Sequence, residues 1–91
     1  MSFQTLPGTA ICLIGGRPVA ILSRQGEVLR LLQPEAAGPA LAAFARDFAQ
    51  RHIFPWLSRI LIRQYPKEAE SALLEAGFTR DMMDWTLWRS R

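Results

Sequence analysis

Side chains that usually carry chemistry are scarce in this 91-residue sequence. It contains one cysteine, Cys12, and one histidine, His52, so neither an intramolecular disulfide nor a zinc site of Cys and His ligands can be built from it. A lone cysteine in an apolar strand is typical of an inert core thiol in a reducing cytoplasm. A Ser-His-Asp or Cys-His catalytic arrangement would have to use His52, which precedes the loop-like residues 53–56 and is expected to be structural or solvated. We therefore expect no catalytic residue, no metal and no cofactor.

Long hydrophobic runs and nucleotide-binding motifs are missing as well. No apolar run approaches the ~18 residues that span a membrane, and the first residues lack the basic and apolar regions of a secretory signal. The sequence also has no Gly-x-x-x-x-Gly-Lys-Ser/Thr motif, which excludes a P-loop nucleotide site. These absences predict a cytoplasmic protein without a membrane partner.

Lysine is nearly absent, and arginine takes its place. The sequence has 11 basic and 8 acidic residues, a net charge of +3, and every basic residue except Lys67 is arginine. Residues 51–63 carry three arginines and no carboxylate, and residues 80–91 carry three arginines against two aspartates. Because a guanidinium binds phosphate in a two-pronged geometry and stacks on bases, this bias favours a nucleic-acid or phosphate partner. A GC-rich genome, which encodes arginine in excess, would also account for it.

The length allows one modest hydrophobic core, since a chain of this size buries roughly 64% of its surface on folding. We therefore expect a single domain over residues 1–91. Three short strands are predicted at residues 9–14, 17–23 and 27–32. Gly15-Gly16 is a two-residue turn signal between the first two, and Gly26 lies in the turn before the third. The three strands are expected to form an antiparallel meander.

The rest of the sequence alternates between helix and strand signals. We predict a helix from Pro39 to about Arg51, a strand over residues 57–64, a second helix from Pro66 to the stop signal Gly77, and a closing hairpin with strands at residues 79–80 and 85–89. The order β-β-β-α-β-α-β(β) predicts the α+β class, with one mainly antiparallel sheet and both helices on one of its faces.

The tryptophans are the most informative aromatic residues. In the last strand Trp85 faces one way, and Thr86 and Trp88 face the other, so one tryptophan is expected in the core and the other outside. Trp56, at the entrance of a strand, is also expected in the core. An exposed tryptophan beside Arg89 would either pack against another domain or stack on nucleic-acid bases, and the sequence leaves both interpretations open.

Two segments of the sequence carry a family resemblance. The first is PGTAICLIGGRPVAILSRQG, residues 7–26, followed by Val28-Leu29, and the second is ALLEAGF, residues 72–78, followed by Leu87. Together they resemble the C-terminal module of the large helicase-related (Lhr-type) DEAD/DEAH helicases, in which three strands with a glycine-containing turn precede an alanine-rich helix. The resemblance implies an accessory domain, excised or split off from a helicase whose motor lies elsewhere. Such a domain takes part in DNA or RNA remodelling and repair and does not hydrolyse ATP itself.

This hypothesis predicts a non-catalytic domain that binds nucleic acid weakly or contacts other domains of a helicase. Phosphate contacts are expected from four arginines and base stacking from one tryptophan, namely Arg59, Arg63, Arg80, Arg89 and Trp88.

The order of elements, closed by Ala76-Gly77-Phe78, also resembles the C-terminal half of GCN5-related N-acetyltransferases. Those enzymes hold the coenzyme A pyrophosphate with an Arg/Gln-x-x-Gly-x-Gly/Ala loop before a helix. Here the stretch starts with Glu35, whose charge would repel a phosphate, and Pro39 removes a backbone N–H donor. This alternative predicts a degenerate acetyltransferase-like topology without coenzyme A binding. A third alternative is a structural module that forms a symmetric homodimer through an exposed apolar strip with Trp85 or Trp88.

Overall fold

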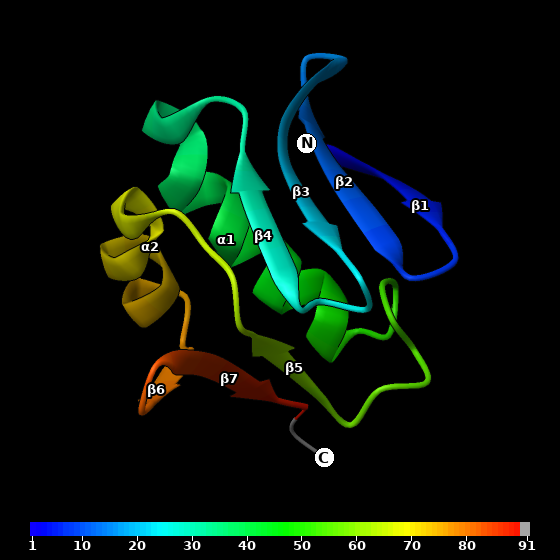
Figure 1. Ribbon diagram of the computed structural model, residues 1–91. Helices are drawn as coiled ribbons and strands as arrows, with labels where there is room; N and C mark the ends of the chain where they lie inside the picture. The colour runs from blue at the N-terminus through cyan, green and yellow to red at the C-terminus, as the bar shows by residue number, and fades with distance from the viewer. Residues whose placement is uncertain (90–91) are drawn as a thin grey trace.

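Seven strands and two helices make up residues 1–89, the part of the chain that the computed structural model describes (Figure 1). The strands are β1 (Ser2–Leu6), β2 (Thr9–Ile14), β3 (Arg17–Ser23), β4 (Val28–Leu31), β5 (Arg59–Ile62), β6 (Thr79–Asp81) and β7 (Asp84–Trp88). The helices are α1 (Ala37–Ala49) and α2 (Glu70–Glu75), which follow the 3-10 turns η1 (Pro34–Ala36) and η2 (Lys67–Ala69). The α+β class is confirmed, and so are the predicted meander, both helices and the closing hairpin, with boundaries shifted by a few residues.

β1 is a strand that the sequence pattern did not predict. Its five residues pair with β2, from Ser2 opposite Leu13 to Leu6 opposite Thr9. Only Phe3 is partly buried in β1, so the strand lacks the strong apolar alternation that marks a half-buried strand in a sequence. The observed order is therefore β-β-β-β-α-β-α-β-β, with one more strand at the start than expected.

The strands form two antiparallel sheets where one sheet was expected (Figure 1). The first has the order β1-β2-β3-β4, and the second has the order β5-β7-β6. The start of β4 and the chain after β5 meet in a parallel bridge between Val28 and Gln64. The Leu29 N–H donates to the Gln64 carbonyl, and the Gln64 N–H donates to the Glu27 carbonyl, at 2.8 and 3.0 Å. One bridge joins the two sheets locally but is too short to merge β4 and β5 into a single ladder.

Glycine ends α2 as predicted. Gly77 adopts φ +101°, a left-handed conformation that glycine reaches without a Cβ clash. The Gly77 N–H donates to the Leu74 carbonyl at 3.2 Å, and the Phe78 N–H donates to the Leu73 carbonyl at 3.0 Å. These two bonds form a Schellman motif, and they turn the chain so that Phe78 enters the core.

Both sheets and both helices share one hydrophobic core. α1 packs against β2 and β3, while α2 packs against α1 and β6. The large, fully buried side chains come from all of these layers and are Phe44, Phe48, Phe78, Leu22, Leu41, Ile53, Ile60, Ile62, Leu73, Val19 and Cys12. The prediction of a buried Cys12 is thereby confirmed. No helix within residues 1–89 has the length and the apolar character of a membrane crossing.

The three tryptophans lie in different environments. Trp85 is 4% exposed and Trp88 is 63% exposed, which confirms the predicted division between a core and an outer tryptophan. The prediction that Trp56 lies in the core is wrong, because this side chain is 57% exposed in the loop between α1 and β5. Phe54 takes the buried position in that loop. The Trp56 ring rests edge-on against Phe54, and its Nε1 donates to Gln25 Oε1 at 3.3 Å.

Candidate nucleic-acid interface

β5 and β7 build a polar outer surface because their side chains alternate between two faces. The isoleucines of β5 are buried, so Arg59 and Leu61 point away from the core. In β7 the same alternation places Thr86 and Trp88 outside. The register sets Arg59 opposite Trp88, Leu61 opposite Thr86, and Thr79 of β6 on the other side of Thr86. We call the surface made by these five residues the outer face of the second sheet.

Arg59 and Trp88 form a stacked pair on the outer face. The Cζ atom of Arg59 lies 5.2 Å from the centroid of the Trp88 ring, within the range of a cation–π contact. The two residues are direct cross-strand neighbours, so the pairing of β5 and β7 positions the contact. Most of the indole still faces solvent, because Trp88 is 63% exposed. In such an arrangement the ring can stack on a base, and the guanidinium can bind the phosphate next to that base.

A shallow depression in the outer face adjoins this pair. Its volume is about 350 Å³, and its lining residues are Arg59, Thr79, Arg80, Asp81, Thr86 and Trp88. Thr86 is 6% exposed, and its Oγ1 finds no hydrogen-bond partner among residues 1–89. The oxygen itself is covered by its neighbours, so it is an unsatisfied polar group beneath the surface rather than an open contact for a ligand. Alternation placed Thr86 on the correct face, but its unpartnered hydroxyl becomes visible only when its neighbours are known.

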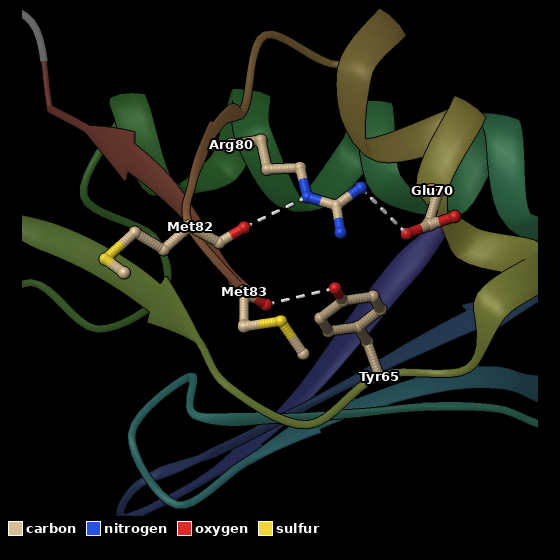
Figure 2. A network of polar contacts seen from close by, with 5 residues as sticks. All are labelled: Tyr65, Glu70, Arg80, Met82 and Met83. Atoms are coloured by element: carbon tan, nitrogen blue, oxygen red, sulfur yellow. Dashed lines mark hydrogen bonds and ion pairs between the residues drawn. The ribbon is translucent and has the colours of Figure 1, made fainter.

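Arg80 borders the depression but directs its guanidinium elsewhere (Figure 2). Its Nη1 forms an ion pair with Glu70 Oε2 at 3.2 Å, and its Nε donates to the Met82 carbonyl at 3.2 Å. Figure 2 also shows Tyr65 Oη donating to the Met83 carbonyl, at 3.0 Å. The two side chains together hold the turn between β6 and β7. Because Glu70 balances much of its charge, the Arg80 guanidinium is less available to an anion than that of Arg59.

Arg63 lies directly after the end of β5, outside the five residues of the outer face. It is exposed, and it lines a separate depression of about 430 Å³ that also contains Lys67 and Glu70. Arg63 lies four positions after Arg59, which corresponds to about 13 Å along an extended strand. At this separation the two guanidinium groups do not form one anion site, and Arg63 lies at the end of β5 that adjoins Asp84.

Carboxylates limit where an anion can bind on this surface. Asp81 borders the depression. It lies opposite Asp84 in the register of β6 and β7, beside the turn that joins these strands. Trp88 lies at the other end of β7, opposite Arg59. A phosphate is therefore favoured at the Arg59 end over the Arg63 end, which adjoins Asp84. Glu27 is the carboxylate nearest this site, because it lines a second depression together with Arg59 and Leu61.

Arg89 is occupied inside the protein. Its guanidinium donates to the backbone carbonyls of Phe48 at 2.9 Å, Phe54 at 2.9 Å, Pro55 at 3.1 Å and Leu57 at 2.7 Å. Burial, and secondarily the positive charge of Arg51, lowers the pKa of Arg89 from its usual value. We assign Arg89 a structural role and leave it out of the proposed phosphate contacts. Arg91, part of the basic segment noted in the sequence, lies outside the described residues.

The residues that could have served catalysis or metal binding are dispersed. The His52 side chain is 62% exposed, and its Nδ1 lies 3.9 Å from Asp47 Oδ2. Cys12 is buried in β2, and burial raises the pKa of its thiol, which disfavours the reactive thiolate. In the part of the chain that the structure describes, no three His, Cys, Asp or Glu side chains lie close enough together to hold a metal ion.

The stretch that corresponds to a coenzyme A loop is helical. Residues 34–36 form η1, and α1 begins directly after it at Ala37, whose N–H donates to the Pro34 carbonyl. Pro39 has no N–H to offer, and a Cβ added to Gly38 would meet nothing within 4 Å. This segment therefore presents the first turn of a helix rather than a glycine loop of free amides around a phosphate.

No family model, curated protein or solved structure matches this chain. The functional proposal therefore depends on the outer face and on the two resemblances in the sequence. Of the five residues predicted to contact nucleic acid, the structure brings Arg59 and Trp88 together and places Arg63 after the end of β5, in a separate depression. It commits the guanidinium groups of Arg80 and Arg89 to contacts within the protein.

Proposed function

We propose that this chain is a non-catalytic accessory module that binds single-stranded nucleic acid weakly on the outer face of its second sheet. The observation that carries the proposal is the stacked pair of Arg59 and the exposed Trp88. The resemblance of residues 7–26 and 72–78 to the Lhr-type module supports a role beside an ATP-dependent helicase motor, in DNA or RNA remodelling and repair. A cytoplasmic location is part of the proposal and is supported by the single, buried, free thiol of Cys12.

Binding exchanges one partner of the Trp88 ring for another. Without ligand, Arg59 rests on the indole. A base then stacks on the ring, and stacking contributes about 1–3 kcal/mol per base. Arg59 turns toward the adjacent phosphate and binds it through its guanidinium. Every base has a π-face, so this mode tolerates many sequences.

Fluorescence anisotropy with labelled single-stranded oligonucleotides tests this proposal. We expect Trp88→Ala to weaken binding at least fivefold, which corresponds to ~1 kcal/mol from one stacked base. Arg59→Ala should weaken binding and also reduce the slope of log K against log salt by about 0.7, because one phosphate contact is lost. The matched control is Arg17→Ala, since this arginine is exposed at the start of β3 in the first sheet. Absence of binding at low salt, or binding that neither salt nor Trp88→Ala changes, would contradict the proposal.

A degenerate acetyltransferase-like topology is the second candidate, favoured by the observed order of strands and helices. It shares with the first candidate the expectation that acetyl-coenzyme A is not bound, because Pro39 and the bonded N–H of Ala37 leave few free donors before α1. Millimolar acetyl-coenzyme A should leave the melting temperature unchanged, whereas a ligand at a hundred times its Kd would add ~2.7 kcal/mol of stability. A clear rise in melting temperature would favour an enzyme instead.

A further inference from the structure

β1 has one backbone edge without a partner. It is the first strand in the order of its sheet and pairs with β2, so within residues 1–89 no strand lies on its other side. Four of its five side chains are exposed, and Leu6 is 63% exposed. In Figure 1 this free edge lies on the side of the molecule away from β6 and β7, and hence away from the outer face.

The edge of β1 lacks the features that usually prevent strand pairing. Residues 1–16 contain no charged side chain, and β1 itself contains no proline. The edge strand of the second sheet differs, because β6 has three residues and two of them, Arg80 and Asp81, are charged. Proteins commonly protect sheet edges with short strands and charges. β6 has this protection and β1 does not.

The hairpin geometry shows which backbone groups point outward. Leu6 and Thr9 flank a two-residue turn, and the residue pair next to such a turn is hydrogen-bonded. Alternation along an antiparallel ladder then directs the N–H and C=O groups of Gln4 toward β2 as well. The same groups of Phe3 and Thr5 point toward the free edge.

We propose that two copies of this chain pair antiparallel through β1, around a two-fold axis at Gln4. Phe3 of each copy exchanges backbone hydrogen bonds with Thr5 of the other copy. The two Gln4 residues face each other in a non-hydrogen-bonded pair, in which side chains lie closest. The first sheets of the two copies become one continuous sheet, and the interface is isologous.

A second copy is the occupant that the charge distribution favours. The chain carries a net charge of +3, but all of its charged side chains lie after residue 16 and hence outside β1 and β2. No two like-charged side chains therefore face each other along the paired β1 strands. β1 is also held in place before pairing, because the Phe3 ring packs against the Phe44 ring of α1 with centroids 5.2 Å apart. A strand that is already ordered loses little conformational entropy on association. The dimer leaves Arg59 and Trp88 of both copies open.

Sedimentation velocity over a hundredfold range of protein concentration tests the pairing. The wild type should form dimers as the concentration rises. Gln4→Lys and Gln4→Glu should each weaken dimerisation at least tenfold, because two like charges face each other across a Cα distance of about 4.5 Å. An equimolar mixture of the two variants should recover the dimer, since opposite charges then meet at the axis. Gln50→Lys is the matched control, an exposed glutamine at the end of α1.

A wild type that stays monomeric over the whole range overturns the proposal. So does a dimer that both Gln4 variants leave unchanged, or one that the mixture fails to restore. If circular dichroism shows that the Gln4 variants are unfolded, hydrogen exchange of the wild type tests the β1 pairing instead. Protection of the Phe3 and Thr5 amides that rises with protein concentration supports pairing, and exchange independent of concentration overturns it.

Discussion

The guanidinium of Arg89 ties the end of β7 to the end of α1 and to the loop that follows α1. Phe54 in this loop has φ +45°, and the irregular backbone leaves several carbonyls outside any helix or sheet ladder. A planar guanidinium has five N–H donors, so it can satisfy several such carbonyls at once. The carbonyl of Phe48 belongs to the last turn of α1, where a cation also interacts favourably with the helix dipole.

We expect Arg89→Ala to lower the free energy of unfolding by about 2–3 kcal/mol, because backbone carbonyls lose a charged donor. Arg89→Lys should lie between this variant and the wild type, since an ammonium keeps the charge but cannot reach all four carbonyls. Urea denaturation followed by circular dichroism measures both effects, with exposed Arg17→Ala as the control. A loss below ~0.5 kcal/mol for Arg89→Ala would show that the carbonyl contacts add nothing.

Sequence alone did not distinguish Arg89 from Arg59. Both arginines are neighbours of Trp88, one along the chain and the other across the sheet. The carbonyl acceptors of Arg89 lie 32 to 41 residues away in the sequence, so no local sequence pattern predicts these contacts. The partner of Arg59 is also distant in the sequence, because β5 pairs with β7 and these two strands are separated in the chain by α2 and β6. Alternation predicts the face on which each of the two side chains lies, but not that they meet.

At the level of elements, the turn between β3 and β4 sets the distance between the two sheets. Arg24, Gln25 and Gly26 have positive φ values of 53°, 57° and 90°. A Cβ added to Gly26 would lie 2.9 Å from Cγ2 of Ile60 in β5. Glycine is therefore required at this position both by the backbone conformation and by the close approach of the second sheet.

We expect Gly26→Ala to lower the free energy of unfolding by about 2 kcal/mol, from strain in φ and from the clash with Ile60. Gly16→Ala is the matched control. Its φ of +80° imposes a similar backbone strain, but no atom lies within 4 Å of the added Cβ, so it should lower stability by only about 1 kcal/mol. Thermal unfolding of the two variants measures the contrast. Equal melting temperatures of the two variants would mean that the turn accommodates an alanine side chain beside Ile60 and does not set the distance between the sheets.

At the level of the whole molecule, one core connects two sheets that share few backbone hydrogen bonds. Val28 and Gln64 form their parallel bridge, and the remaining connection is made by side chains on α1, α2 and the inner faces of both sheets. Because neither sheet buries its apolar face without the helices, we expect the sheets to lose structure together.

Two probes in different sheets test this cooperativity. Cys12 reports on the first sheet, because its buried thiol reacts with an alkylating reagent only when β2 is exposed. Trp85 reports on the second sheet by fluorescence, in a background with Trp56→Phe and Trp88→Phe. The two urea midpoints should coincide. Alkylation of Cys12 at a urea concentration that leaves the Trp85 signal unchanged would show that the sheets unfold separately.

Local chemistry was sufficient to predict the α+β class, the end of α2 at Gly77 and the two faces of β7. These features depend on dihedral preferences and on a period of two residues, which are properties of neighbouring residues in the chain. Long-range packing alone established the pairing of β1, the division into two sheets, the exposure of Trp56 and the carbonyl partners of Arg89. Each of these depends on groups that are distant in the sequence and meet only when the core forms, so no short pattern contains them.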